Sequence, residues 1–222
     1  GAEFFQDDLV PDPNVFSAKI ANQFVFGAQM GWFSLGGDSN MNPPMGIYDL
    51  LMDPSYDDEV GYLRKLSAAK QAGADYFNFG RAMRPLPLSV NTTQSVPTLS
   101  VARAPAVRMH SSDPSSSSSV SLSVSFGAVM SGVWMSAHND ALLIAITTVT
   151  RGAPASAAFS IDLRNYGFEA ATSPAFELSQ INVDSGARTH VATFNDFQVS
   201  HNASLSAHDV VLLEVTHTSH AQ

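Results

Sequence analysis

The fold is decided first by residues 21–37, which read ANQFVFGAQMGWFSLGG. The apolar triplet at 24–26 is continuous rather than alternating, which is typical of a strand covered on both faces, as in a parallel sheet. Gly27 and Gly31 precede Trp32, and Gly36 and Gly37 come after it. Residues 34–54 are rich in glycine, proline and polar residues. We therefore expect a buried strand that runs into a long glycine-hinged loop. Loops of this length are commonly functional, and this one displays a tryptophan.

A short helix is expected before this strand. Asp12 and Pro13 have the order of an N-cap followed by proline at the first helical position. Val15 and Ile20 are spaced for one apolar face, so the helix is expected to end near Asn22, directly before the strand.

A longer helix is expected over residues 55–80. Ser55 is a favourable N-cap, and the acids at 57–59 complement the positive end of the helix dipole. Apolar residues between Val60 and Phe77 recur at three- and four-residue steps. Gly80 stands where a helix-ending glycine belongs, and prolines follow it.

From residue 89 onwards the apolar period changes to two. Val120–Phe126 alternates strictly, as a half-buried strand does. Ser115–Ser119 is low-complexity sequence and is expected to be a mobile loop between strands. About eight or nine short strands with polar or glycine-bearing connections indicate an antiparallel sandwich. The further strands are expected at Val129–Met135, Leu142–Val149, Ala157–Leu163, Ala175–Ile181, Arg188–Phe194 and Val210–Val215.

The order helix, strand, loop, helix is what the last unit of an α/β barrel supplies. We therefore expect an α/β part followed by an all-β part. Residues 1–88 are expected to be the C-terminal units of a (β/α)8 TIM barrel, and residues 89–222 an antiparallel β-sandwich. Two helices and one inner strand cannot close a core, so the chain is expected to be a fragment whose barrel lies mostly upstream.

Composition excludes several classes of function. A net charge of −9 with 11 Lys and Arg argues against nucleic-acid binding, which needs clustered cations. No cysteine is present, so disulfides and thiolate metal sites are excluded. The longest apolar run, Ala141–Ile146, is far shorter than the roughly 20 residues of a membrane span. Seven histidines show no metal-binding spacing, and no phosphate loop or Gly-x-Ser-x-Gly elbow occurs, so no metal and no cofactor are expected.

Two N-glycosylation sequons begin at Asn91 and Asn202. They would suit a secreted protein, but a chain this rich in serine and threonine contains about as many by chance. The sequence therefore leaves the localisation open.

Gln29 and Trp32 are the candidate substrate-binding residues. An indole stacks on the apolar face of a sugar and an amide bonds its hydroxyls, and both residues follow a strand at the end where barrel enzymes bind substrate. The alternative is structural, with Trp32 filling the gap between barrel and sandwich. Trp134 and the turn at 165–167 are expected to be sandwich core and corner.

Glycoside hydrolysis usually needs two carboxylates. The acids expected near the barrel face are Glu3, Asp7, Asp8 and Asp38, each of which could equally be a solvated loop charge. The catalytic residues therefore stay unassigned, and the decisive pair is expected upstream.

The chain resembles the C-terminal region of TIM-barrel glycoside hydrolases, particularly a poorly characterised family of glycosidases. The resemblance is carried by FGAQMGWF at 26–33, EVGYLRKL at 59–66 and YFNFGRAMRP at 76–85, then by strands like 141–149 and 206–215. It implies a carbohydrate-active enzyme with a carbohydrate substrate, whose last barrel strand and helix lead into an all-β domain. The chain lacks the strands that carry acid and base in that family.

Two hypotheses of different class remain. In the first, the chain is the C-terminal part of a glycoside hydrolase and is not catalytically complete by itself. In the second, the sandwich is a non-catalytic carbohydrate- or protein-binding module, and the first 88 residues are a packing adaptor.

Overall fold

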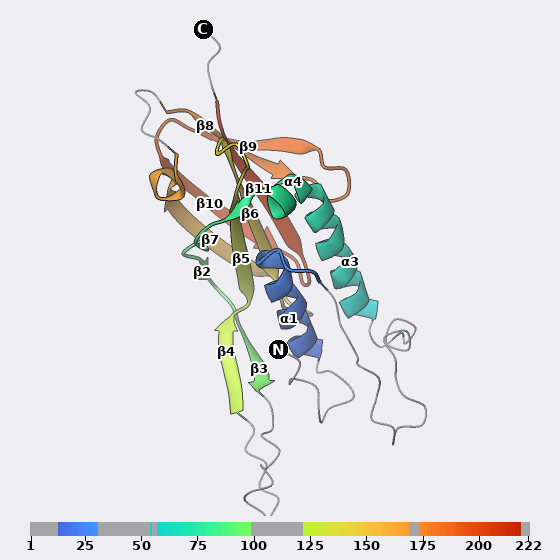
Figure 1. Ribbon diagram of the computed structural model, residues 1–222. Helices are drawn as coiled ribbons and strands as arrows, with labels where there is room; N and C mark the ends of the chain where they lie inside the picture. The colour runs from blue at the N-terminus through green and yellow to red at the C-terminus, as the bar shows by residue number, and fades with distance from the viewer. Residues whose placement is uncertain (1–12, 31–53, 55–56, 99–121, 169–173, 219–222) are drawn as a thin grey trace, which may run out of the picture.

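The computed structural model describes residues 13–30, 54, 57–98, 122–168 and 174–218. In this part of the chain, a layer of helices covers one face of an antiparallel β-sandwich (Figure 1). The helices of the layer are α1 (Pro13–Val25), α3 (Asp57–Ala72) and α4 (Ala74–Phe79).

The larger sheet is antiparallel throughout and has the strand order β1-β5-β6-β11-β8-β9. Its strands are β1 (Arg81–Ala82), β5 (Val129–Met135), β6 (Ala141–Thr148), β8 (Phe176–Ile181), β9 (Arg188–Phe194) and β11 (Val210–His217).

A smaller sheet of order β10-β7-β2 packs against the other face, and a hairpin of β3 and β4 extends from one end of the sandwich (Figure 1). These strands are β2 (Ser89–Val90), β3 (Thr93–Thr98), β4 (Leu122–Gly127), β7 (Ala155–Asp162) and β10 (Gln198–Leu205). A short 3-10 helix, η4 (Leu163–Tyr166), forms the corner after β7.

Strand β6 is buried along its whole length because both of its faces are covered. Leu142 and Ile144 point into the core between the two sheets. Leu143 and Ala145 point the other way, into the core between the larger sheet and the helices. The unbroken apolar run of this strand is therefore the sequence signature of two-sided burial, which an antiparallel sheet shows here because helices cover its second face.

The helices pack by single apolar faces. On α3, Tyr62, Leu66 and Ala69 recur at three- and four-residue steps and are fully buried against the sheet. On α1, Ile20 and Phe24 are buried beside them. The sequence predicts that the apolar faces of these helices need neighbours from outside the chain. That prediction is wrong for the faces that pack on the larger sheet, because the chain's own strands cover them.

The strand expected at residues 24–26 is also wrong. Phe24 and Val25 end α1 and are buried, and Phe26 lies in the turn that follows and is 60% exposed. A short apolar run has the same pattern in a strand and at the buried end of a helix, so the run alone does not distinguish them. Here the preceding helical pattern continues through it.

The helix expected over residues 55–80 is confirmed as two helices with a break at Gly73. A Cβ atom at Gly73 would lie 2.9 Å from the Phe77 ring and 3.0 Å from Leu143, so the close approach of this turn to the sheet requires glycine. Gly80 ends α4 as expected, but in an extended rather than a left-handed conformation.

The antiparallel β-sheets predicted for the second part of the chain are confirmed, and they include a strand before residue 89, since β1 at Arg81–Ala82 pairs with β5. Strands β5 and β9 have the predicted bounds, the other predicted strands differ by a few residues at their ends, and β1, β2 and β3 were not predicted. Strand β10 was not predicted, because its inward residues include the polar His201 and the small Ala203. The corner role of Tyr166 is confirmed: it is buried between the sheets, and Gly167 follows with a φ of 96°.

Trp134 is core, but not the core that the sequence suggested. Its indole lies between the larger sheet and the helices, with its ring 5.4 Å from that of Phe77. It therefore fills the gap between the two layers, which is the structural role considered for Trp32.

Strands of a barrel are not among the described elements, all of whose strand pairs are antiparallel. The domain boundary at residue 88 stays a prediction. The long loop at 34–54 and the serine run at 115–119 lie outside the described residues. None of the described helices combines the length and the apolar character that crossing a membrane requires.

Candidate functional site

Gln29 is exposed on the segment that leaves α1 and lines an open groove of about 360 Å³ between this segment, α3 and α4. We call it the Gln29 groove. Most of its lining carries amide, hydroxyl or ammonium groups. The lining residues are Gln29, Met30, Ser67, Lys70, Gln71, Ala74 and Asn78.

Two features hold the segment that carries Gln29. Lys70 on α3 donates hydrogen bonds from Nζ to the carbonyl oxygens of Gly27, at 3.1 Å, and Ala28, at 2.8 Å. A cation at the C-terminal end of α1 is also favourable to the helix dipole. Gly27 has a φ of +67°, and a Cβ atom there would lie 2.5 Å from the Trp134 ring. The chain can therefore turn over Trp134 only because residue 27 is glycine.

The chemistry of the groove suits an uncharged ligand rich in hydroxyl groups. Gln29, Gln71 and Asn78 each offer an amide donor and an amide acceptor. The ammonium group of Lys70 already donates to two backbone carbonyls. No carboxylate is among the described lining residues, so this part of the chain supplies neither a carboxylic acid nor a carboxylate base at the groove.

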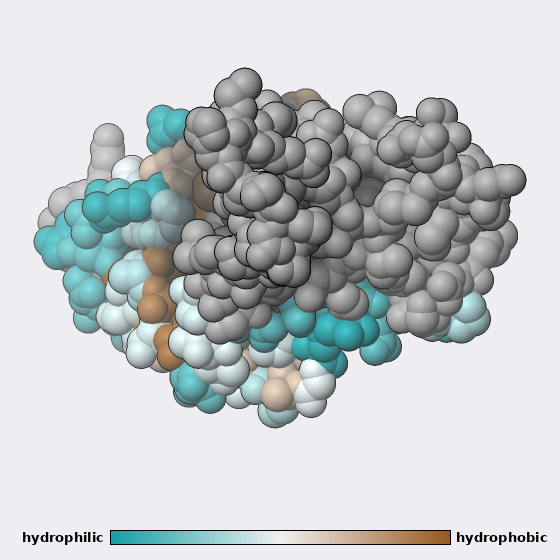
Figure 2. All heavy atoms as spheres, turned by 90° about the horizontal axis from the view of Figure 1, so that it is seen from below, coloured by the Kyte–Doolittle hydropathy of each residue, from teal (hydrophilic) through white to brown (hydrophobic). Residues whose placement is uncertain are grey.

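Exposed aromatic side chains lie beside the groove in the sequence. Phe79, which is 73% exposed, follows Asn78, and Phe26, which is 60% exposed, precedes Gly27. Within the described residues the other large exposed apolar side chain is Val191 on β9. Seen from below, the described surface is mostly hydrophilic, with narrow strips of hydrophobic residues (Figure 2).

A second polar cluster lies buried between the helices and the sheet. Ser17 on α1 and His208, in the turn between β10 and β11, form a hydrogen bond of 2.8 Å between Oγ and Nε2. The His208 ring stacks on Tyr62 at a centroid distance of 4.5 Å, and the Tyr62 hydroxyl lies 2.7 Å from Thr147 Oγ1. Burial, reinforced by the positive charges of Arg151 and Lys65, lowers the pKa of His208 to about 4, against the opposing effect of Asp58.

A serine bonded to a histidine is also the beginning of a nucleophilic dyad. Ser17 is 0% exposed and His208 is 6% exposed, so no substrate reaches them in this structure. The pair therefore ties α1 to the sheet rather than acting in catalysis.

A third cluster centres on Glu214 of β11, which is 4% exposed. Its carboxylate accepts a hydrogen bond of 2.6 Å from the Tyr76 hydroxyl and two from the guanidinium of Arg188. Burial opposes ionisation of Glu214, but these bonds outweigh it and hold its pKa below the usual range. Burial and the bond to Glu214 raise the pKa of Tyr76. This cluster joins α4 to β9 and β11.

Glu59, which the sequence explained by helix electrostatics alone, has a specific partner. It is 1% exposed, and its Oε1 lies 2.7 Å from Nε of Arg151, in the loop after β6. The pair is an ion pair rather than an aligned hydrogen bond, because neither Glu59 oxygen meets hydrogen-bond geometry. Asp57 and Asp58 are exposed in the first turn of α3, as expected.

The structure places one of the two predicted substrate-binding residues. Gln29 lies at the Gln29 groove, whereas Trp32 and the candidate acids Glu3, Asp7, Asp8 and Asp38 lie outside the described residues. Among the described residues no group of three His, Asp or Glu side chains is arranged to hold a metal ion.

Sequence reasoning missed Gln71, Asn78 and Phe79. The helical period offered a signal for Phe79, since it falls off the apolar stripe that contains Tyr76 and Phe77. An aromatic residue off the stripe is expected to face solvent.

Comparisons with known proteins give a partial relationship. No family model matches the chain. A protein of Monosiga brevicollis named "Putative glycoside hydrolase 22789" is 34% identical over 94 residues, which cover 39% of this chain and 8% of that protein. The matched region is thus a small part of a much longer relative.

Solved structures give a weaker likeness. A structure titled "Glycoside hydrolase" aligns over 96% of this chain and 39% of its own, with 12% identity and a TM-score of 0.37. A family 5 glycoside hydrolase from Bacteroides vulgatus aligns over 95% of this chain and 38% of its own, with 14% identity and a TM-score of 0.35. Scores of this size do not establish a shared fold. The comparisons therefore relate part of this chain to a protein named as a glycoside hydrolase.

Proposed function

We propose that this chain is the C-terminal part of a glycoside hydrolase that acts on a carbohydrate. Residues 1–88 would be the last units of a TIM barrel, and residues 89–222 the sandwich packed against them. The observation that carries the proposal is the Gln29 groove, since its amides, and the exposed Phe79 that follows Asn78 in the sequence, are side-chain types that bind sugars. The partial identity to the Monosiga brevicollis protein supports the same class.

The surface of α3 supports the barrel part of the proposal. Besides the face that packs on the sheet, α3 lines a second groove of about 540 Å³; Leu63 lines it while also packing against the core between the sheet and the helices, and Val60 and Ala68 are its other apolar residues. A helix with apolar side chains on two sides is typical of one placed between two layers. In a complete barrel, neighbouring units would cover this second side.

The complete enzyme would cleave a glycosidic bond with two carboxylates, one as proton donor and one as nucleophile or water-activating base. The described residues at the Gln29 groove supply neither. Gln29 would bond sugar hydroxyls, and Trp32, two residues past the end of the described segment, would stack on the sugar ring. This chain alone is therefore proposed to contact substrate but not to turn it over.

The test joins this chain to its upstream coding sequence and assays hydrolysis of a panel of aryl glycosides. We expect activity from the joined protein, and loss of sugar affinity in Gln29→Ala and Trp32→Ala. Gln198→Ala, which removes an exposed glutamine from the opposite layer, is the matched control. An inactive joined protein that binds no sugar, or affinity unchanged by Trp32→Ala, would count against the proposal.

The alternative is a non-catalytic binding sandwich. Such a module would need stacking side chains on its own surface, but the large exposed aromatic residues of the described chain, Phe26 and Phe79, both belong to the helical layer. Isolating the sandwich would also uncover Leu143, Leu212 and Trp134, which the helices now cover. The two hypotheses are therefore best separated in the full chain, by which surface responds to sugar.

A further inference from the structure

The outer face of the smaller sheet is lined by small, mostly polar side chains. In β7 and β10 every second residue points into the core between the sheets, and the residues between them face solvent. No aromatic side chain is among the described residues of this outer face, which we call the serine face. Its residues are Ser89, Ser156, Ala158, Ser160, Ser200, Asn202 and Ser204.

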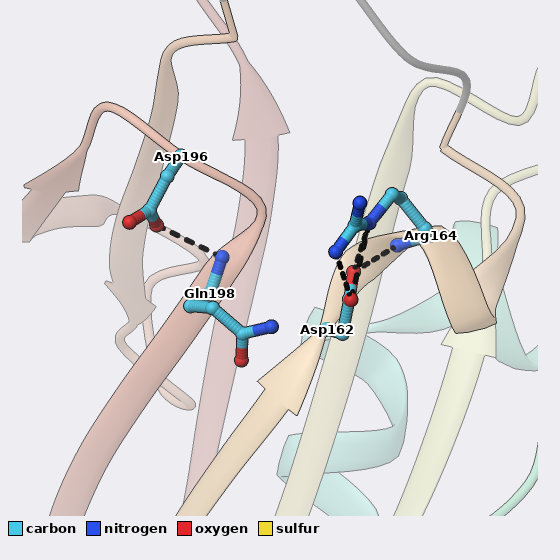
Figure 3. Close-up of polar contacts among 4 residues, drawn as sticks. All are labelled: Asp162, Arg164, Asp196 and Gln198. Atoms are coloured by element: carbon cyan, nitrogen blue, oxygen red, sulfur yellow. Dashed lines mark hydrogen bonds and ion pairs between the residues drawn. The ribbon is translucent and has the colours of Figure 1, made fainter.

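The charged side chains at the end of the serine face are held by local hydrogen bonds. Arg164 of η4 donates three side-chain hydrogen bonds to the carboxylate of Asp162, at 2.5 to 3.1 Å (Figure 3). Asp196 accepts a bond of 2.9 Å from the backbone N–H of Gln198 in the turn before β10. The residues of the serine face itself therefore present hydroxyl and amide groups, and the charged side chains lie at its end.

Asn202 lies in the middle of this face and is exposed. Its cross-strand partner is Ala158, and its neighbours on the same face of β10 are Ser200 and Ser204. None of these side chains is large enough to cover the carboxamide. Ala203 and Ser204 complete an Asn-x-Ser sequon, and the Ser204 hydroxyl faces solvent on the same side as Asn202.

The other sequon, at Asn91, is held differently. Asn91 Oδ1 accepts hydrogen bonds from the backbone N–H of Ser156, at 2.9 Å, and from the Thr92 hydroxyl, at 3.0 Å. Its carboxamide is thus fixed against the start of β7. The chain therefore contains one sequon with an unobstructed amide and one whose amide is part of the fold.

We propose that Asn202 is an N-glycan acceptor and that Asn91 is not. Transfer would join Asn202 Nδ2 to the anomeric carbon of an oligosaccharide carried on a lipid diphosphate. The bond between that carbon and the diphosphate oxygen breaks, the lipid diphosphate leaves with the electron pair, and a base of the transferase takes one amide proton. The glycan would then rest on the serine face.

The position on β10 gives the modification a physical consequence. Strand β10 is the edge of the smaller sheet in the described chain, so its outer backbone groups are open to pairing with another chain. A glycan in the middle of the strand would block that approach. The modified protein is therefore expected to aggregate less than the unmodified protein, with an unchanged fold.

The experiment is peptide mapping by mass spectrometry of the full chain, expressed with a secretory leader in eukaryotic cells. Secreted and retained pools are both analysed. We expect a glycan on Asn202 in both pools, with this asparagine converted to aspartate when an amidase releases the glycan, and an unmodified Asn91. Asn202→Gln and Ser204→Ala should each abolish the modification, and Asn91→Gln should leave it unchanged.

Absence of a glycan from Asn202 in both pools would overturn the proposal. Occupancy of Asn91 equal to that of Asn202 would overturn its structural basis, since the fixed carboxamide would then make no difference. Enzymatic removal of the glycan should leave the unfolding temperature unchanged and increase aggregation on heating. Equal aggregation before and after removal would contradict the proposed protection of the strand edge.

Discussion

Ser17 Oγ lies 2.8 Å from His208 Nε2, although the two residues are 191 positions apart in the chain. Through this bond, and through the stacking of its ring on Tyr62, His208 contacts both α1 and α3. His208 itself has a φ of 47°, a left-handed conformation that non-glycine residues adopt rarely. A single turn residue of the sandwich thus contacts both long helices, in addition to the apolar faces by which they pack on the sheet.

The first prediction concerns pH. The pKa of His208 is lowered from 6.5 to about 4 in the folded protein, so the unfolded chain binds the proton more readily between these values. Stability should therefore fall as the pH decreases from about 6.5 to about 4, by roughly 3 kcal/mol from this group. Urea unfolding across this range measures the effect.

His208→Asn is the control, because asparagine also tolerates a left-handed backbone and does not titrate. The variant should be less stable at pH 7 but should lose less stability than the parent between pH 6.5 and 4. Parallel pH profiles of parent and variant would show that His208 is not the titrating group.

The second prediction compares two buried tyrosines. Tyr76→Phe removes a hydrogen bond to the ionised carboxylate of Glu214, and Tyr62→Phe removes one to the neutral hydroxyl of Thr147. Bonds to charged groups contribute more, so we expect losses of roughly 2 kcal/mol for Tyr76→Phe and about 1 kcal/mol for Tyr62→Phe. Denaturant unfolding at pH 7 tests the order, and a larger loss for Tyr62→Phe would contradict it.

The third prediction concerns the contact of α1 with β5. A Cβ atom at Gly132 would lie 2.1 Å from the carbonyl oxygen of Val25, and a backbone atom cannot rotate away. Gly132→Ala should therefore destabilise the protein by about 3 kcal/mol, at the upper end for an overpacked core. Thermal unfolding, with helix content followed by circular dichroism, measures the loss.

Gly61→Ala is its matched control. Gly61 lies inside α3 with open space around its Cβ position, so alanine should increase stability by up to about 1 kcal/mol. If Gly132→Ala and Gly61→Ala changed the stability equally, the result would contradict the close contact of α1 with β5 at Gly132.

The β part of the fold could be predicted from sequence because period-two alternation survives wherever one face of a strand is covered. Strand β7 shows this, since its residues alternate between buried and more exposed positions along its whole length. The rule for two-sided burial was sound but was applied to residues 24–26, whereas it describes β6. Distinguishing the buried helix end at residues 24–26 from the buried strand β6 requires knowing which faces the helices cover. That information comes only from the tertiary structure.

The candidate site was predictable only in part. The prediction of Gln29 rests on its amide and on an expected strand at residues 24–26; that strand is wrong, but the structure places Gln29 on a groove whose lining residues include two further amides. Gln71 and Asn78 join it from α3 and α4, and no local pattern marks them as neighbours of Gln29. The hydrogen bond between Ser17 and His208 could not be predicted from the sequence either, because it depends on how the helices pack on the sheet.

The most direct test of the carbohydrate proposal is a two-dimensional NMR titration of the full chain with neutral oligosaccharides, observing side-chain amide groups. The proposal predicts saturable shifts of the Gln29, Gln71 and Asn78 amides, whereas the amides of Gln198 and Asn202 on β10 should be unaffected. Shifts confined to the serine face, or none with any sugar, would contradict it.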